Sequence, residues 1–529
     1  MTMDHEGSST EVDGRLNRES TSLGVEMFEV SKIKDVHLLE PKVLGLASIM
    51  LLAIASSAPL VGAIGNIPLG VGLGNGIGMP GGYIVVTIVL LIFCVGYIAM
   101  ARKLTAAGGF YSFISHGLSR PLGLAAGWSA LGGYLLVEVA LIGAVGYFGA
   151  NTFSTVFHLN FSWVVYSFLA IAVVSALSYF DVRLSAKVLG VALVVETLAI
   201  FIMDIAVLVK SGTHHQFSLT PLSPVKAFSG IAPGVGIFFA FWSFLGFEVV
   251  PNYAEESKNP SKYGAWGLYG AVGLIGVTYV LTSWAGIVGH GLSNAVKAST
   301  TDPVNFFYSL STQYVGTWLT DVMKVLIVTS ALACALAFHQ TTSRYFYALG
   351  RENVLPPAFG RTHPRYKSPH FAAMFQMIAV TIVTLVFIVF WYQSKSAQSF
   401  SGNFQNAPYY ELFGWLAIAT TFWVLINEVL SSLATIVFFQ KPANKADAHL
   451  WSTIVAPLVG GAAMTYFLYL LWSNLDTVGG NVIWVKIIPW VCIAWFLVGL
   501  VWAYWFKVKR PERYLGIGRL VNNALKVSD

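Results

Sequence analysis

The chain has 529 residues, of which 56% are hydrophobic and only 11% are charged, and its formal net charge is +6. Soluble proteins carry charge on roughly a quarter of their residues, so this composition excludes a soluble globular protein and indicates a chain that lies largely in lipid. The sequence has no metal-spaced histidine cluster, nucleophile elbow or phosphate-binding loop, so an enzyme or an ATP-driven pump has no support, and we expect no metal and no cofactor.

Stretches of about 20 apolar residues, the length that crosses a bilayer as a helix, recur along the chain between short polar breaks. We expect twelve such helices, near residues 43–66, 83–101, 121–150, 162–180, 186–209, 231–254, 266–289, 317–348, 370–392, 410–438, 451–473 and 483–507. Those at 121–150 and 317–348 are long enough to tilt or to project from the membrane. The predicted fold class is an all-α integral membrane protein of about twelve transmembrane helices.

The basic residues orient this topology, because the cytoplasmic loops of membrane proteins collect Lys and Arg. With both termini on the cytoplasmic side, 25 of the 31 basic residues fall on that side. The remaining basic residues lie outside, and they are Lys210, Lys226, Lys297, Lys324, Lys395 and Lys486. We therefore predict a multi-pass protein of the cytoplasmic membrane with both termini inside, and the positive charge gives no support for nucleic-acid binding.

The predicted helices divide the chain into two comparable blocks. We expect a disordered cytoplasmic tail at 1–40, a first inverted repeat of five helices at 41–210 and a second at 231–440. Two more helices occupy 441–507, and a cytoplasmic tail follows at 508–529. Each block opens with a helix that contains helix-breaking residues, and this pairing is typical of inverted-repeat transporters, whose binding site lies at the breaks.

The first of these helices is interrupted within Ala55-Ser56-Ser57-Ala58-Pro59. Proline removes a backbone donor and disfavours the helical conformation of the residue before it. Peptide groups freed by a break cannot face lipid, so protein, water or a ligand must satisfy them. Because the positive end of a half-helix suits a carboxylate, these five residues are candidate substrate contacts, and an ordinary proline kink is the alternative.

The matching segment of the second block, residues 233–248, combines glycines, aromatic residues and an acid. Its candidate substrate-binding residues are Phe241, Trp242, Ser243 and Phe244. Small residues also let membrane helices approach closely, so the glycines fit simple packing as well as a break. The presence of Glu248 favours a functional role for this segment over simple packing, because an ionisable group inside a membrane span needs a cavity or a partner.

Acidic side chains are the only charged groups expected deep inside the predicted spans, and they are Glu138, Glu196, Asp204, Glu248 and Glu428. These acids are either protonated or meet a cation such as a substrate ammonium, a sodium ion or a proton. Glu248, Glu196 and Glu138 are candidates for ion coupling or proton sensing, whereas Asp204 and Glu428 fit neutral, hydrogen-bonded acids at least as well. His339 is expected towards the end of its segment, where it caps or hydrogen-bonds.

Three stretches of the sequence resemble those of a known family. The first runs from residues 108–111 through Arg120-Pro121 to Gly127-Trp128, and the second comprises residues 239–248 followed by 255–260. The third comprises residues 343–351 with Leu355-Pro356 and His363-Pro364. Together they resemble the amino acid-polyamine-organocation superfamily of transporters, over about residues 41–507. The resemblance implies the five-plus-five inverted-repeat fold of the leucine transporter, two extra C-terminal helices and a rocking-bundle cycle of alternating access.

Residues 242–248 are similar to a segment of bacterial arginine/agmatine antiporters, which implies that Trp242 caps the substrate and that Glu248 takes part in proton-sensitive behaviour. The chain departs from the family at the first break, where Ser56-Ser57-Ala58-Pro59 replaces a common Gly-Ser-Gly element. It also departs in helix five, where Glu196 stands near the position of a lysine found in proton-coupled relatives.

We therefore predict a secondary active transporter, a permease of amino acids or related amines, that works by ion-coupled symport or exchange and is not an enzyme. Its expected partners are the amino acid or amine substrate, a proton or sodium ion, and the lipid bilayer. A transporter-like membrane sensor that binds a solute without net transport is the alternative. The particular solute, the coupling ion and the oligomeric state stay open at this point.

Overall fold

The computed structural model describes residues 39–104, 108–180, 182–213 and 217–518, without the side chains of 182–189, 212 and 213. The predicted N-terminal tail up to residue 38 and the last part of the C-terminal tail, residues 519–529, lie outside the described residues. Eleven helices in the described part of the chain are long and apolar enough to cross a membrane. A shorter apolar helix, Trp163–Tyr179, adds a twelfth segment, and the predicted all-α fold of about twelve spans is confirmed.

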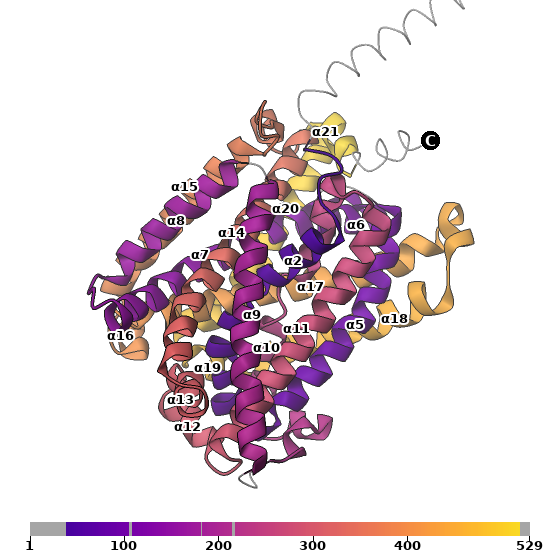
Figure 1. Ribbon diagram of the computed structural model, residues 1–529. Helices are drawn as coiled ribbons and strands as arrows, with labels where there is room; N and C mark the ends of the chain where they lie inside the picture. Colours follow the sequence, from indigo (N-terminus) through magenta and orange to yellow (C-terminus); the bar gives the residue numbers. More distant parts are fainter. Residues whose placement is uncertain (1–38, 105–107, 181, 214–216, 519–529) are drawn as a thin grey trace, which may run out of the picture.

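Ten of these segments contain a long continuous α-helix. They are α5 (Met79–Lys103), α7 (Arg120–Val156), α8 (Trp163–Tyr179), α9 (Val182–Thr213), α11 (Pro260–His290), α14 (Thr317–Arg351), α15 (His370–Gln393), α17 (Gly414–Gln440), α18 (Ala456–Ser473) and α20 (Ile483–Lys509). At 1.5 Å rise per residue, the 37 residues of α7 extend about 55 Å. This length exceeds the bilayer core, in agreement with the oblique course of α7 (Figure 1).

Local sequence signals explain where some of these helices begin. Ser119 precedes α7 and its hydroxyl accepts a hydrogen bond from the backbone N–H of Leu122, at 3.4 Å. Asn259 precedes α11 and caps the N–H of Lys262 in the same way, at 3.1 Å. Polar side chains of this kind satisfy donors that the first helical turn leaves unpaired, so both long helices begin after a polar capping residue and carry a proline in the first turn.

The two remaining segments are interrupted, one in each predicted repeat. The first consists of α2 (Leu46–Ser56), α3 (Pro59–Val61), the π-helical turn η1 (Gly62–Asn66), α4 (Ile67–Leu69) and the π-helical turn η2 (Gly70–Gly74). The second consists of α10 (Pro233–Trp242) and the 3₁₀ helix η6 (Phe247–Glu256). The first segment thus runs to residue 74, beyond the predicted end at 66, because π-helical turns let the glycine-rich sequence continue as a helix.

Short helices cover the two ends of the bundle. They are α6 (Gly109–Gly117), α12 (Ala295–Thr301), α13 (Asn305–Tyr314), α16 (Lys395–Ser401), α19 (Leu475–Gly479) and α21 (Pro511–Gly516), with 3₁₀ turns η3 (Gly76–Gly78), η4 (Thr220–Leu222), η5 (Pro224–Phe228), η7 (Pro357–Gly360) and η9 (Pro442–Asp447). The π-helical turns η8 (Pro408–Phe413) and η10 (Leu450–Val455) lead into α17 and α18. Helices α6 and α21 lie at one end of the molecule, and α12 and α13 lie at the other (Figure 1).

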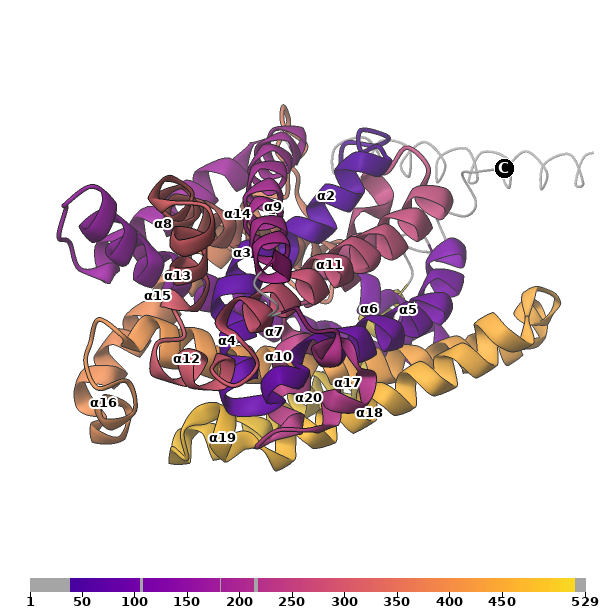
Figure 2. The same ribbon diagram turned by 60° about the horizontal axis from the view of Figure 1, so that its bottom comes forward.

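The interrupted helices occupy the centre, and continuous helices surround them. α14 packs along α7, and α11 packs along α5, while α8 and α15 lie side by side at the periphery (Figures 1 and 2). Large apolar side chains of the peripheral helices point outward, among them Val386 and Val389 of α15 and Val501 of α20. Lipid is the solvent that fits such a surface, so the outer helices shield a central region from the membrane.

A backbone contact ties the two interrupted segments together at the end that carries α6 and α21. The N–H groups of Val43 and Leu44 both donate to the carbonyl of Glu256, at 2.9 Å. In return, the N–H of Lys258 donates to the carbonyl of Leu44, at 2.9 Å. The start of the first interrupted segment and the end of the second are therefore held as one unit.

Candidate functional site

The first break lies at Ser57 and Ala58, between α2 and α3. Ala58 has φ +41°, a left-handed conformation that L-residues rarely adopt. The N–H groups of Ser57 and Ala58 donate back to Ile54 and Ala55, and Pro59 has no N–H to continue the α2 ladder. A new helix starts at Pro59, and the unpaired N–H groups of its first turn form a positive end that points towards the break.

The second break lies between α10 and η6, at residues 243–246. Gly246 has φ +111°, and a Cβ atom there would lie 2.5 Å from the Cβ of Ser56. Only glycine fits such a close approach, because any side chain would collide with the end of α2. The last carbonyls of α10 form the negative end of a helix, so the two breaks bring a positive and a negative helix end together.

Side chains join the two breaks across the centre of the protein. The Ser57 hydroxyl donates to the carbonyls of Phe244 and Leu245, at 3.1 and 3.4 Å. The backbone carbonyl of Ser57 accepts from the Tyr279 hydroxyl of α11 at 3.0 Å, and that of Ser56 accepts from the Cys334 thiol of α14 at 2.9 Å. These contacts satisfy part of the exposed backbone, as burial inside a membrane protein requires.

A small cavity opens beside the breaks. Its lining residues carry no formal charge, and they are Ser56, Ser57, Ala58, Val61, Gly62, Asn66, Val137, Leu141, Trp242, Leu245, Cys334, Phe338 and Phe413. Trp242 and Phe413 form part of the wall with their rings nearly perpendicular, 5.9 Å between centroids. The cavity is therefore mostly apolar, with the helix ends and a few small polar groups on one side.

The structure places some of the predicted substrate-binding residues at this cavity. Ser56, Ser57, Ala58 and Trp242 line it. The other predicted contacts are not among the lining residues, and they are Ala55, Pro59, Phe241, Ser243 and Phe244. Pro59 and Ser243 still shape the site, since one starts a half-helix and the other follows the last residue of α10.

Sequence reasoning missed most of the opposite wall. Val137 and Leu141 come from α7, Cys334 and Phe338 from α14, and Phe413 from η8. Apolar residues in a membrane span give no signal that separates a cavity wall from a lipid-facing surface. Asn66 did carry a signal, because a lone amide in an apolar helix needs a partner.

Glu248 lies directly after the second break and is 1% exposed. One carboxyl oxygen, Oε1, accepts from the Tyr134 hydroxyl of α7 at 3.0 Å, and Oε2 accepts from the N–H of Gly246 at 2.8 Å. The acid does not line the cavity. It is positioned to link the second break to α7, one of the helices that form the cavity wall.

Glu196 lies on α9 and is buried against α14. Its carboxyl group lies beside Ser330, one turn before the cavity residue Cys334, and its Oε2 has no hydrogen-bond partner among the described residues. Asp204, also on α9, accepts a hydrogen bond from Thr282 of α11 at 2.7 Å. Asp204 Oδ1 likewise has no partner among the described residues, so Glu196 is distinguished by its place beside Ser330, behind the α14 side of the cavity.

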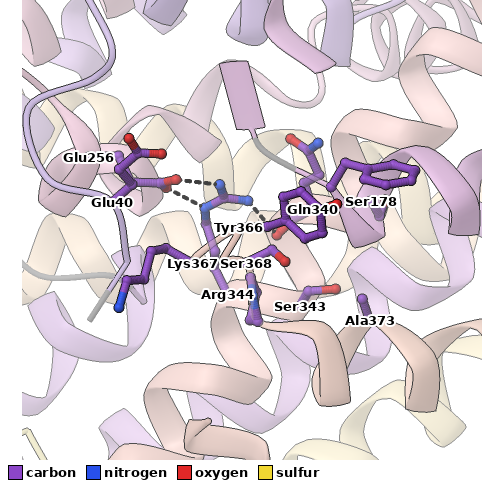
Figure 3. A pocket seen from close by; sticks show the side chains of 12 residues that line it. Glu40, Ser178, Glu256, Gln340, Ser343, Arg344, Tyr366, Lys367, Ser368 and Ala373 are labelled. Atoms are coloured by element: carbon purple, nitrogen blue, oxygen red, sulfur yellow. Dashed lines mark hydrogen bonds and ion pairs between the residues drawn. The ribbon is translucent and has the colours of Figure 1, made fainter. Parts of the chain in front are cut away.

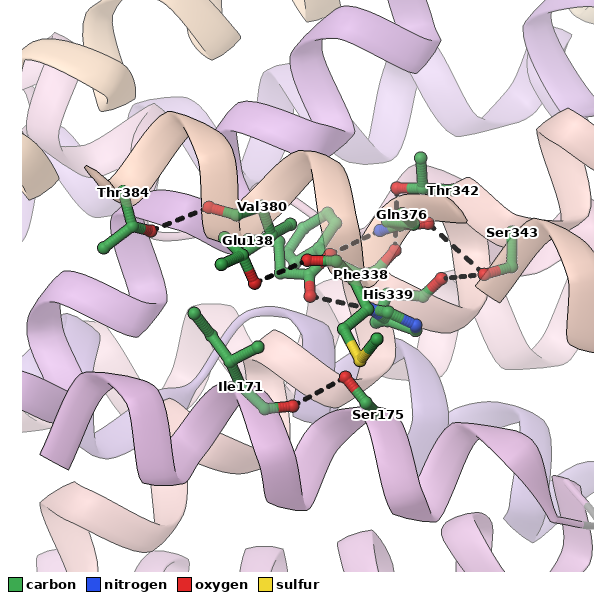
Figure 4. Close-up of polar contacts among 12 residues, drawn as sticks. Glu138, Ile171, Ser175, Phe338, His339, Thr342, Ser343, Gln376, Val380 and Thr384 are labelled. Atoms are coloured by element: carbon green, nitrogen blue, oxygen red, sulfur yellow. Dashed lines mark hydrogen bonds and ion pairs between the residues drawn. The ribbon is translucent and has the colours of Figure 1, made fainter. Parts of the chain in front are cut away.

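Glu138 forms a buried polar cluster with two other helices (Figure 4). Its Oε1 lies 2.7 Å from Nδ1 of His339 on α14, and its Oε2 accepts from the side-chain amide of Gln376 on α15. His339 lies well inside α14, not towards a segment end as expected, and its Nε2 has no partner among the described residues. Because Val137 and Phe338 precede these residues in sequence and line the cavity, the cluster lies behind the cavity wall.

A second cavity lies around Arg344 and Glu256 (Figure 3), at the end of the molecule that carries α6 and α21. Arg344 of α14 and Glu256 of η6 meet there in a two-pronged ion pair, with Nε to Oε2 at 2.7 Å and Nη2 to Oε1 at 2.9 Å. The Arg344 guanidinium also donates to the Gln340 carbonyl at 3.0 Å and lies over the Tyr253 ring. This ion pair fastens the second interrupted segment to α14.

Comparison with known proteins agrees with this architecture. A family model described as amino acid permease matches residues 48–514. The match covers most of the chain, so the chain belongs to the amino acid permease family, and the resemblance to the amino acid-polyamine-organocation superfamily is confirmed.

The curated relatives are also transporters. The branched-chain amino acid permease BcaP of Bacillus subtilis (strain 168) is 24% identical over 455 residues, which cover 83% of this chain and 87% of its own. The methylthioribose transporter of the same bacterium is 26% identical over 377 residues, 70% of each chain. The low-affinity putrescine importer PlaP of Escherichia coli (strain K12) is 25% identical over 305 residues, which cover 55% of this chain and 63% of its own. The chain is therefore a multi-pass membrane transporter of this family and not an enzyme.

Proposed function

We propose that this protein is a secondary active transporter that moves an amino acid or a related amine across the cytoplasmic membrane by ion-coupled alternating access. The observation that carries the proposal is the meeting of two helix breaks at one cavity in the centre of the protein. A positive half-helix end at Pro59 and a negative end at Trp242 face the same region. Opposite dipole ends at one cavity suit a zwitterion better than a neutral or singly charged solute.

The relatives' names support a substrate with an amine. One relative is named for branched-chain amino acids and another for putrescine. Both kinds of molecule carry an ammonium group, and the first also carries a carboxylate. The relative named for methylthioribose shows that membership of the family does not by itself fix the solute. The geometry of the breaks therefore supplies the argument for an amino acid.

Contacts at the two ends of the cavity suggest how access alternates. Towards α6 and α21, the Arg344–Glu256 ion pair holds η6 against α14. Towards α12 and α13, the Tyr409 hydroxyl of η8 donates to the Gly65 carbonyl at 2.8 Å, and Trp242 meets Phe413. We propose that the Arg344–Glu256 ion pair separates when the site opens to the cytoplasm. The contacts near α12 and α13 separate when the site opens outward, so that one end of the protein is closed at any time.

Three buried acids are candidates for coupling to a proton or a sodium ion. Glu248 contacts the second break directly, Glu196 keeps an oxygen without a partner among the described residues behind the cavity, and Glu138 is paired with His339. A carboxyl group that gains or loses a proton or a cation changes these contacts. We assign the first role to Glu248, since it joins a break to a neighbouring helix.

The distribution of basic residues supports an orientation with both termini in the cytoplasm. Arg102, Arg120, Arg361 and Lys441 all border the end that carries α6 and α21. Cytoplasmic loops collect such residues, so we place this end on the cytoplasmic side.

Uptake by the purified protein in proteoliposomes tests the proposal. Radiolabelled amino acids and amines should accumulate saturably when a proton or sodium gradient is imposed, and a solute bound without flux would support a sensor. Absence of both binding and transport for every amino acid and amine would overturn the proposal.

A further inference from the structure

Asn66 in η1 lines the cavity, and the orientation of its side-chain amide follows from its neighbours. The Ser243 hydroxyl donates its only proton to the Phe239 carbonyl, at 2.7 Å. Ser243 must then accept from both of its other contacts, Nδ2 of Asn66 at 3.0 Å and the Tyr83 hydroxyl at 3.0 Å. The Asn66 amide nitrogen is therefore held on Ser243, and its oxygen is left facing elsewhere.

That oxygen has no partner in the described part of the chain. Asn66 is 3% exposed and lines the cavity, and its Oδ1 makes no hydrogen bond to any described residue. A buried acceptor without a donor is unfavourable, so such an atom in a binding cavity calls for a donor that a ligand brings. The amide cannot rotate to hide its oxygen without losing the bond to Ser243.

The position of Asn66 identifies the donor. Ser243 directly follows Trp242, the last residue of α10, so the amide stands at the negative end of that half-helix. An ammonium group has three N–H donors and no acceptor. It fits a place where helix carbonyls and a fixed amide oxygen converge, while the carboxylate of the same molecule fits the positive end at Pro59.

The rest of the cavity wall indicates what kind of substrate side chain the site accepts. Val137, Leu141 and Phe338 are apolar, and the lining residues include no Asp, Glu, Lys or Arg. The nearby acids are not among the lining residues: Glu248 is bound by Tyr134 and Gly246, Glu138 by His339, and Glu196 lies behind α14 beside Ser330. A second charge on the substrate would have no counter-charge in the cavity, and burial of an unpaired charge is very costly.

The geometry points to Asn66 as the residue that binds the substrate's α-ammonium through Oδ1, in a site that takes amino acids with uncharged side chains. This inference rests on the proposed transport function and deepens it by naming the substrate class. Diamines, dibasic amino acids and acidic amino acids are disfavoured, because each carries a charge that the cavity does not neutralise.

Binding to the purified full-length protein tests the substrate class. The ligands are alanine, valine, leucine, glutamate, lysine and putrescine, measured by competition at one pH. At least one neutral amino acid should bind at least tenfold more tightly than glutamate, lysine and putrescine. Tighter binding of a charged ligand would overturn the inference and leave the transport proposal standing. If none of the three neutral amino acids binds, the inference about the substrate class is overturned, and the transport proposal is overturned only if every other amino acid and amine also fails to bind and to be transported.

Two variants test Asn66, with the best-bound neutral amino acid as ligand. Asn66→Leu keeps the shape and removes the acceptor, so the dissociation constant should rise about tenfold, the factor typical of one hydrogen bond to a charged group. Asn427 on α17 is also fully buried and accepts from Ser129 at 3.1 Å, but it does not line the cavity. Asn427→Leu is the matched control and should leave the dissociation constant unchanged within twofold.

Asn66→Asp gives a readout that a merely structural role cannot produce. It adds a negative charge without changing the shape, so it should bind 3-methylbutylamine, which is leucine without its carboxylate, at least fivefold more tightly than the unaltered protein does. If Asn66→Leu keeps the original affinity, or if Asn66→Asp folds and gains no affinity for the amine, Asn66 is not the ammonium-binding residue.

Discussion

The hydroxyl of Tyr134 on α7 donates a hydrogen bond of 3.0 Å to the carboxyl group of Glu248, directly after the second helix break. The other oxygen of that carboxyl group holds the N–H of Gly246 inside the break. A change in the charge of one acid therefore alters the link to α7 and the geometry of the break together. We therefore propose Glu248 as the acid whose protonation would move the second interrupted segment.

Glu248→Gln should flatten the dependence of uptake on external pH between about 5 and 8, because glutamine cannot exchange a proton; its oxygen can still accept from the Gly246 N–H, while its amide nitrogen would donate to the Tyr134 hydroxyl. The measurement is initial uptake rate into proteoliposomes over this pH range. Glu411→Gln is a matched control, since Glu411 is fully buried in η8 and accepts from the N–H of Ser401 outside the cavity lining. An unaltered profile in Glu248→Gln would transfer the coupling role to Glu196 or Glu138.

Trp242→Ala should weaken substrate capture much more than it disturbs insertion into the membrane. Trp242 lines the cavity and packs against Phe413, and loss of a buried aromatic contact of this kind costs about tenfold or more in affinity. The dissociation constant of the transported amino acid and the yield of folded protein are measured in parallel. Trp242→Phe, which keeps a ring in the wall, should recover most of the affinity; equal affinity in Trp242→Ala would remove this residue from the site.

The sequence predicted the two breaks because proline, glycine and small polar residues weaken the helical hydrogen-bond ladder within an apolar span. It also marked Glu248, Glu196 and Glu138 as acids that need partners. The sequence could not predict the partners of these acids, because a partner can lie far away along the chain, as His339 lies 201 residues from Glu138. Periodicity in a membrane helix does not distinguish a side chain that faces a cavity, such as Val137, from one that faces lipid, and only tertiary packing settles which is which.

Gly246→Ala should impair both stability and transport. Its positive φ of +111° and the 2.5 Å approach of a new Cβ atom to Ser56 combine backbone strain with a steric clash. We expect a loss of about 1–3 kcal/mol in the free energy of unfolding, measured as a lower melting temperature in detergent. Gly273 in α11 has no heavy atom near its would-be Cβ, so Gly273→Ala should be neutral or slightly stabilising, as expected for a helical glycine. Similar melting temperatures for both variants would contradict the close contact of the two breaks.

Arg344→Leu and Glu256→Leu should each lower stability by about 3–5 kcal/mol, because each removes one member of a buried, two-pronged ion pair. Both side chains are 3% exposed. The double variant should lose less than the sum of the two single losses, since each single substitution already removes the same interaction. Chemical or thermal unfolding of the four proteins measures this cycle, and simple additivity would contradict an energetic coupling between the two residues.

The exposed ion pair between Lys103 and Asp447 provides a control with the same 2.7 Å separation. Because solvent screens it, Asp447→Asn should cost about 1 kcal/mol or less.

The ion pair of Arg344 and Glu256 also bears on access to the cavity at the end of the protein that carries α6 and α21. Ser343 lines that cavity, and the native cysteines are all buried, so a cysteine introduced as Ser343→Cys reports opening. Its alkylation should accelerate when Glu256 is also replaced by Leu, because η6 is then no longer held against α14; an unchanged rate would show that other contacts keep this end closed.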